Sequence, residues 1–226
     1  MNETLVMVLR WLHILAGFGA FFIAPIPLTT AKGGRTHRRW GKIYFWLMAV
    51  VASTAIVLAI WRPVVFLALV AVFSFYFAFR GYRVLGRKRP DHGQGPKALD
   101  WIGALVALAG SFGLIVLGIW RPTPVWQQLG VVAVVFGAVG AGIAGYDLRQ
   151  FTHPPRDKSF WWYSHMSGMI GSYIAAVSAF SVVNFSFLPT VIRWLWPTAI
   201  GLPLLFYWIR AYRKKFSARV SPSPAD

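Results

Sequence analysis

Apolar residues fill this chain in seven long runs, and short polar segments separate the runs. Each run has about the 20 residues that an α-helix needs to cross the hydrocarbon core of a bilayer. Because helices satisfy their own backbone hydrogen bonds in lipid, the pattern predicts an all-α integral membrane protein, a bundle of seven transmembrane helices. The predicted spans are 4–28, 43–61, 64–82, 99–120, 125–148, 161–185 and 190–212.

The composition agrees with a chain that is surrounded by lipid. Hydrophobic residues make up 57% of the sequence and charged residues only 13%, which is far from the balance of a soluble domain. The start Met-Asn-Glu-Thr lacks the basic segment and the cleavage site of a signal peptide, so we expect the first span to be retained. We expect one transmembrane domain over residues 1–215 and a disordered cytoplasmic tail over residues 216–226.

The positions of the basic residues predict the orientation of the bundle. All but four of the 23 Lys and Arg residues lie near the links 1–2, 3–4 and 5–6 and in the tail; the exceptions are Arg10, Arg62, Arg121 and Arg193. Short cytoplasmic loops retain basic residues, so this bias predicts an outside N-terminus and a cytoplasmic C-terminus in a bacterial inner membrane. The same cationic face is expected to attract anionic lipids. The aromatic residues belong to the apolar runs, which argues against nucleic-acid binding.

A short repeat ends two of the predicted spans. Residues 56–63 read Ile-Val-Leu-Ala-Ile-Trp-Arg-Pro, and residues 115–122 read Ile-Val-Leu-Gly-Ile-Trp-Arg-Pro. One interpretation is a duplicated helical hairpin, with parallel copies over residues 1–63 and 64–122. The other is that Trp-Arg-Pro is an interface anchor with a helix stop, which any span could use.

Small residues at four-residue spacing predict two close helix contacts. Such residues let backbones approach each other in lipid. Gly137, Ala141 and Gly145 follow one side of the fifth span, and a similar row follows one side of the sixth. That second row consists of Ser164, Gly168, Ser172 and Ala176.

Polar groups at membrane depth are costly, so each is a candidate for function. The candidates for ligand binding are His13, His37, Arg38, Asp100, Asp147 and His165. All except His13 are expected near the cytoplasmic leaflet. Imidazole and carboxylate groups could bind a metal ion or haem, or hold a quinone head group and exchange protons with it. The metal-ligand candidates are His37, Asp100, Asp147 and His165. The alternative is that both aspartates pair with Arg or Lys at helix ends and each His donates to a carbonyl.

Several classes of site are excluded or disfavoured. The chain has no cysteine, which excludes disulfides, thiolate metal sites and cysteine nucleophiles. His13 and His165 differ in depth by roughly 10 Å at the helical rise, which disfavours them as two axial haem ligands. The last span has no lysine for a retinal Schiff base, and no His-Glu-x-x-His, Gly-x-Ser-x-Gly or Walker motif occurs. Whether the protein is an enzyme stays open.

Three features resemble a family of bacterial polytopic membrane proteins that has no settled function. They are His13 in the first span, the loop Lys32-Gly-Gly-Arg-Thr-His37-Arg-Arg-Trp-Gly-Lys42, and His165-Met-Ser-Gly-Met-Ile-Gly-Ser-Tyr in the sixth span. The loop fits His-Arg-x-x-Gly and the late span fits His-x-x-x-Met, and the matches cover about a quarter of the chain. The resemblance implies that His13, His37, Arg38 and His165 are positions to test.

Three hypotheses follow. The leading one is an inner-membrane protein with a polar site for a metal, haem or quinone-like ligand, acting in membrane redox or in the assembly of respiratory complexes. The second is a small-solute or proton-coupled transporter whose midplane site contains His13. The third is a non-catalytic structural or lipid-binding subunit, with a membrane-protein partner or a second copy of itself.

Overall fold

The computed structural model describes residues 2–218, and this part of the chain is helical with no strand. Its elements are α1 (Glu3–Ile23), α2 (Pro25–Thr29), α3 (Arg35–Trp61), α4 (Val65–Arg83), η1 (Val84–Gly86), η2 (Pro90–His92), α5 (Ala98–Trp120), α6 (Pro124–Thr152), α7 (Phe160–Asn184) and α8 (Thr190–Ala218). The prediction of an all-helical protein is confirmed.

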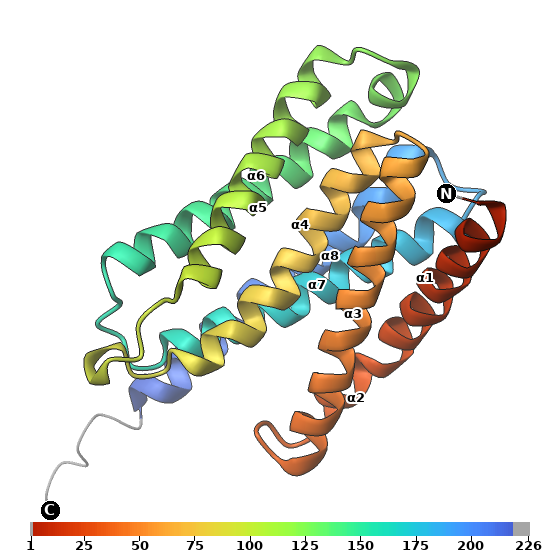
Figure 1. Ribbon diagram of the computed structural model, residues 1–226. Coiled ribbons are helices and arrows are strands. Elements are labelled where there is room, and N and C mark those ends of the chain that lie inside the picture. The colour runs from red at the N-terminus through yellow and green to blue at the C-terminus, as the bar shows by residue number, and fades with distance from the viewer. Residues whose placement is uncertain (1, 219–226) are drawn as a thin grey trace, which may run out of the picture.

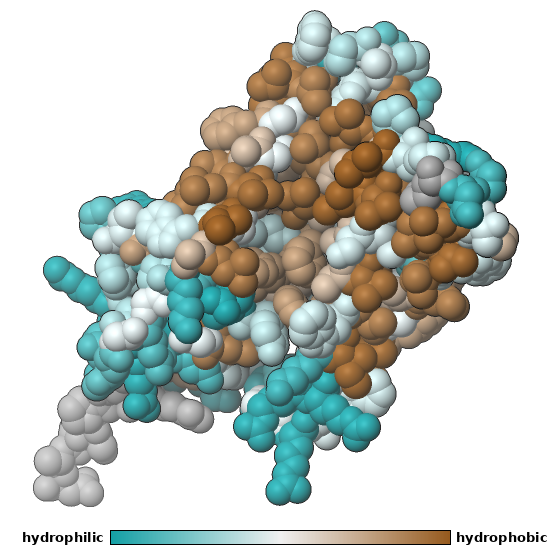
Figure 2. All heavy atoms as spheres, viewed as in Figure 1, coloured by the Kyte–Doolittle hydropathy of each residue, from teal (hydrophilic) through white to brown (hydrophobic). Residues whose placement is uncertain are grey.

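Six stretches of the described chain are long and apolar enough to cross a membrane: Glu3–Thr29, Arg35–Trp61, Val65–Gly86, Ala98–Trp120, Pro124–Thr152 and Phe160–Asn184. Large apolar side chains such as Leu15, Ile60 and Trp120 are exposed on them, as expected where lipid is the solvent. Figure 2 shows this apolar surface across the middle of the visible face, with hydrophilic residues at both ends and the most strongly hydrophilic ones at the lower end. The chain therefore has the character of a multi-pass membrane protein. The seventh predicted span corresponds to α8, whose apolar run includes Arg193 and two prolines.

The links α2–α3, α4–α5 and α6–α7 lie at one end of the molecule, in the lower part of Figure 1. We call this the basic end, because these links and their flanking turns carry most of the Lys and Arg residues. The links α3–α4, α5–α6 and α7–α8 lie at the opposite end (Figure 1).

The helix limits differ from the predicted ones where polar segments extend a helix or a proline interrupts it. The first predicted span is divided at Pro25, which lacks an N–H for the helical ladder. Residues 35–42, expected in a loop, form the first turns of α3, so His37 lies on a helix. The α8 helix continues to Ala218, which corrects the predicted start of the tail at residue 216. The remainder of that tail, residues 219–226, lies outside the described residues.

Helix α4 is the central element of the bundle. It contacts α3, α5, α6 and α7, and Figure 1 shows it between the α1–α3 pair and the α5–α6 pair, with α7 and α8 behind. Its crossing with α7 is close, because a Cβ on Gly168 would lie only 2.6 Å from the Cα of Gly81. The predicted small-residue row of the sixth span is confirmed at Ser164, Gly168 and Ser172, which are all buried.

Glycines also bring α5 and α6 together. A Cβ on Gly118 would lie 2.8 Å from the carbonyl oxygen of Gly130, and one on Gly137 would lie 2.6 Å from that of Ser111. Gly145 faces open space, so the predicted row of Gly137, Ala141 and Gly145 is wrong at its last member. The buried row of α6 instead continues through Gly140, Ala144 and Asp147, because the helix presents that face to its neighbours.

Both copies of the Ile-Trp-Arg-Pro repeat end a helix, α3 at Trp61 and α5 at Trp120. The next residue differs in conformation: Arg62 is extended, with φ −108°, whereas Arg121 is left-handed, with φ 52°. The shared sequence therefore stops a helix without fixing the turn that follows. The duplicated hairpin stays a prediction.

Candidate functional site

Two of the predicted site residues, His37 and His165, meet at the basic end. His37 lies on the first turn of α3 and His165 near the start of α7. Their ring centroids are 6.1 Å apart with an interplanar angle of 66°, and both residues are half-buried. We call these two residues the imidazole pair. They are 128 positions apart in the sequence, and only the fold brings them together.

Each ring of the imidazole pair is oriented by a backbone carbonyl. His37 Nδ1 lies 2.9 Å from the carbonyl oxygen of Pro27, and His165 Nδ1 lies 2.7 Å from that of Gly81. A carbonyl only accepts, so Nδ1 donates in both rings, and a neutral ring then keeps its lone pair on Nε2. The predicted hydrogen bonds from histidine to carbonyls are confirmed. They also assign the tautomer, leaving two Nε2 acceptors in one small region.

The charged surroundings of the imidazole pair are cationic. The Lys32 amine donates to the Pro27 carbonyl that also accepts from His37, at 3.0 Å. Lys88 and Lys32 lie close enough to His165 to act on it electrostatically, as does His37. Lys88 is itself held over the Trp161 ring, 4.4 Å from the centroid. This environment favours a neutral or anionic ligand over a divalent cation.

Asp147 belongs to a separate network that joins α4, α6 and α7. Its carboxylate accepts from Arg80 Nε at 2.6 Å and Arg80 Nη2 at 2.7 Å, and Tyr76 OH donates to the same carboxylate at 2.7 Å. Arg80 Nη1 donates to Ser167 Oγ at 2.9 Å and to the Ser164 carbonyl at 3.2 Å. We call these five residues the Arg80 network. Arg80 is 3% exposed and Asp147 2%, so the pair is a buried, bidentate ion pair.

Asp100 belongs to a second ion-pair group at the start of α5. It accepts from Arg83 Nε at 3.0 Å and Arg83 Nη2 at 2.8 Å, and Arg87 Nε lies 3.8 Å away. The backbone N–H of Lys97 also donates to Asp100, at 2.9 Å, which caps the first turn of the helix. Its carboxylate thereby fixes the α4–α5 link to the end of α4.

The predicted metal-ligand set of His37, Asp100, Asp147 and His165 is not assembled. Within residues 2–218, no three His, Cys, Asp or Glu side chains lie close enough to hold a metal ion. The structure brings the two histidines together and leaves both aspartates with arginines. The alternative prediction, that the aspartates pair with basic residues at helix ends, is the correct one for Asp100 and Asp147.

His13 and Arg38 lie apart from the imidazole pair. His13 Nδ1 lies 3.1 Å from both the Val51 carbonyl and Thr54 Oγ1, so this ring links α1 to α3. His13 precedes Pro27 by enough residues to lie about 20 Å deeper than the imidazole pair at the helical rise, which is more than the roughly 10 Å expected from the sequence and favours a packing role. Arg38 is exposed on α3 beside His37.

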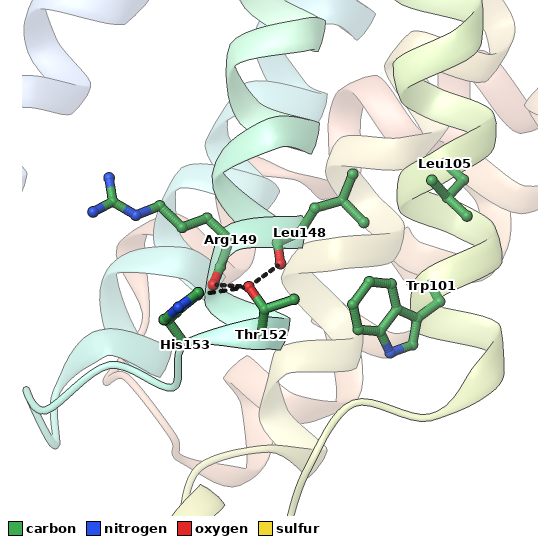
Figure 3. A pocket seen from close by; sticks show the side chains of 6 residues that line it. All are labelled: Trp101, Leu105, Leu148, Arg149, Thr152 and His153. Atoms are coloured by element: carbon green, nitrogen blue, oxygen red, sulfur yellow. Dashed lines mark hydrogen bonds between the residues drawn. The ribbon is translucent and has the colours of Figure 1, made fainter.

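A separate groove of about 530 Å³ lies at the basic ends of α5 and α6. Figure 3 shows Trp101, Leu105 and Leu148 forming its apolar part, and Arg149 with His153 at the polar side. His153 Nδ1 lies 2.8 Å from Thr152 Oγ1. Neither member of the imidazole pair lines this groove.

Sequence reasoning missed the role of Arg80. It counted this residue among the loop charges that set the orientation, although residue 80 falls inside the predicted third span, 64–82. A cation inside an apolar run was the available signal, because such a charge needs a partner in the bundle. Tyr76, one helical turn earlier, carried the same signal more weakly.

The comparisons with known proteins gave no match: no family model matches the sequence, and neither a curated protein nor a solved structure matches the chain. The resemblance to a bacterial membrane-protein family therefore stays a prediction.

Proposed function

We propose that this chain is a bacterial inner-membrane protein whose imidazole pair binds the head group of a quinone-like, lipid-soluble ligand and exchanges protons with it. The observation that carries the proposal is the orientation of the pair. Both Nδ1 atoms donate to carbonyls, and both Nε2 atoms are therefore available to a ligand hydroxyl or, once protonated, to a ligand carbonyl.

The apolar neighbourhood supports an amphipathic ligand. One to three helical turns deeper than the pair lies a core formed by α1, α3 and α4, with residues such as Ala24, Phe45 and Ala78, against which Met169 of α7 packs. A ligand with a polar head at the imidazoles and an apolar body toward lipid fits that change in polarity.

A metal ion suits the pair less well. Zinc sites in proteins use three or four protein ligands, whereas two imidazoles meet here. The amines of Lys32 and Lys88 act on the same region and would repel a divalent cation.

The proposal includes seven spans, with α8 as the seventh, the N-terminus outside and the basic end in the cytoplasm. The distribution of basic residues supports this topology. Because the chain has no cysteine, single cysteines can be introduced without background. In intact cells, a membrane-impermeant maleimide should label Thr123→Cys and should label Arg39→Cys only after permeabilisation. The reverse pattern would place the imidazole pair on the other side of the membrane.

Binding is tested on the full chain in lipid nanodiscs with a short-chain benzoquinone as the probe. We expect saturable binding that His37→Ala and His165→Ala each weaken at least about tenfold, because each removes one direct hydrogen bond to the ligand. His92→Ala and His153→Ala are matched controls, since both histidines are exposed at the same end, and they should leave binding unchanged.

The same preparation distinguishes a quinone from the alternative ligands, haem and a metal ion. An optical spectrum and a metal analysis of the purified wild-type chain should show neither a Soret band nor a stoichiometric metal. Absence of quinone binding, or a haem or metal that is lost with His165→Ala, would overturn the quinone assignment.

A further inference from the structure

A second pocket lies at the basic end, between the α4–α5 link and the start of α7. Its volume is about 410 Å³, and its lining residues are Lys88, Arg89, Asp91, His92, Lys158 and Trp161. Neither histidine of the imidazole pair lines this pocket, and the pocket shares no lining residue with the groove in Figure 3.

The pocket carries an excess of positive charge that the described chain does not neutralise. Lys88, Arg89 and Lys158 form no salt bridge among residues 2–218. Asp91, the carboxylate in the lining, has His92 Nε2 at 3.8 Å as its ion-pair partner. Three cations against one carboxylate make the pocket a site for an anion.

Trp161 restrains one cation of the pocket, Lys88, and indicates that the pocket lies at the membrane interface. Lys88 Nζ lies over its ring, 4.4 Å from the centroid, and such cation–π contacts restrain an otherwise flexible amine. Trp161 stands one helical turn before His165 on α7 and beside Trp162. Tryptophan at a span end is typical of head-group depth.

From these observations we propose that the pocket binds a phosphate group, supplied by the head group of an anionic phospholipid. The three cations bind the phosphate, and the acyl chains leave past Trp161 into the bilayer. Neither histidine of the imidazole pair lines this site, although the Lys88 charge also acts on His165, and the proposal does not depend on quinone binding. A free phosphate offers the same chemistry, so the experiment has to distinguish the two sources.

The test is native mass spectrometry of the delipidated full chain, titrated with phosphatidylglycerol or with phosphatidylcholine of the same acyl chains. We expect one phosphatidylglycerol to bind per chain, about tenfold or more tighter than phosphatidylcholine. Lys88→Gln/Lys158→Gln should weaken the binding of phosphatidylglycerol about 25-fold, since each amine near the surface contributes about a fivefold factor. Lys214→Gln/Lys215→Gln is the matched control, because it removes two exposed cations of α8 outside the pocket, and it should change binding less than about twofold.

Inorganic phosphate then identifies the source of the group. If millimolar phosphate leaves phosphatidylglycerol bound, the lipid is the ligand. If phosphate displaces phosphatidylglycerol from the wild-type chain but not from the Lys88→Gln/Lys158→Gln variant, the pocket is a phosphate site, and the proposal that a lipid supplies the phosphate is overturned. Equal binding of the two lipids, or equal weakening by both double variants, overturns the proposal. Should Lys88→Gln/Lys158→Gln fail to fold, Lys158→Gln alone serves, because that side chain is exposed, and about fivefold weakening is expected.

Discussion

The Arg80 network and the imidazole pair are neighbours that use polar groups in opposite ways. Both lie at the basic end, and both depend on α4 and α7, through the adjacent residues Arg80 and Gly81. In the Arg80 network the guanidinium and the carboxylate bond to each other and to surrounding groups. In the imidazole pair, one nitrogen of each ring is used and the other keeps a lone pair. Satisfied polar groups thus hold the helices together, whereas each partly used ring keeps a lone pair to which a ligand could donate a hydrogen bond.

The largest effect is expected from breaking the Arg80 network on one side. Asp147→Asn leaves the buried Arg80 charge without its counter-charge, which should cost about 3–5 kcal/mol of unfolding free energy. Denaturant unfolding of the purified chain in detergent measures it. Replacing both charges, as in Arg80→Met/Asp147→Leu, should recover much of the loss. A cost below about 1 kcal/mol for Asp147→Asn would mean that the ion pair does not stabilise the bundle.

A smaller effect is expected at the crossing that holds α4 against α7. Gly168→Ala places a Cβ 2.6 Å from the Cα of Gly81 and 2.7 Å from the carbonyl oxygen of Phe77. Because these are backbone atoms, the helices must separate, at a cost of about 1–3 kcal/mol in the same unfolding assay. Gly142→Ala is the matched control, since nothing lies within 4 Å of its added Cβ. It should be neutral or slightly stabilising, and equal costs at both glycines would contradict a tight crossing.

The smallest effect on stability is expected from the imidazole pair itself. His165→Ala removes one hydrogen bond to the Gly81 carbonyl and should cost about 1 kcal/mol. The same variant should lose quinone binding, so stability and binding separate here. If the unfolding free energy falls by more than about 3 kcal/mol, the pair is a structural element comparable to the Arg80 network.

The depth of each polar residue along the membrane normal could be predicted from the sequence, but the direction in which its side chain points around the helix axis could not. The sequence placed His37 and His165 at the same level, and the structure confirms that they meet. It also placed Asp100 and Asp147 at that level, yet these side chains point to Arg83 and Arg80. The distribution of charge along the chain indicates how deep a residue lies in the membrane. The rotation of each helix about its own axis depends instead on packing at contacts such as that of Gly81 with Gly168.

Helix boundaries failed where a local effect outweighed hydropathy. Pro25 divides the first apolar run into α1 and α2, because proline removes a backbone donor, although the run Glu3–Thr29 still counts as one candidate span. The polar residues 35–42 are helical although they read as a loop, since Gly34 lies at the N-cap of the helix and long basic side chains tolerate helical conformation well. Both differences bear on the imidazole pair, because Pro27 and His37 lie in these two segments and form a hydrogen bond.

The neighbouring positions of Arg80 and Gly81 give the ion pair a second consequence. The two residues are consecutive on α4, so the bidentate ion pair of Arg80 with Asp147 also restrains the position of the Gly81 carbonyl relative to α7. Turning α4 about its long axis would withdraw that carbonyl from His165 and free the ring to exchange its tautomer. The ion pair of Arg80 with Asp147 therefore also helps to hold the hydrogen bond that fixes the His165 tautomer.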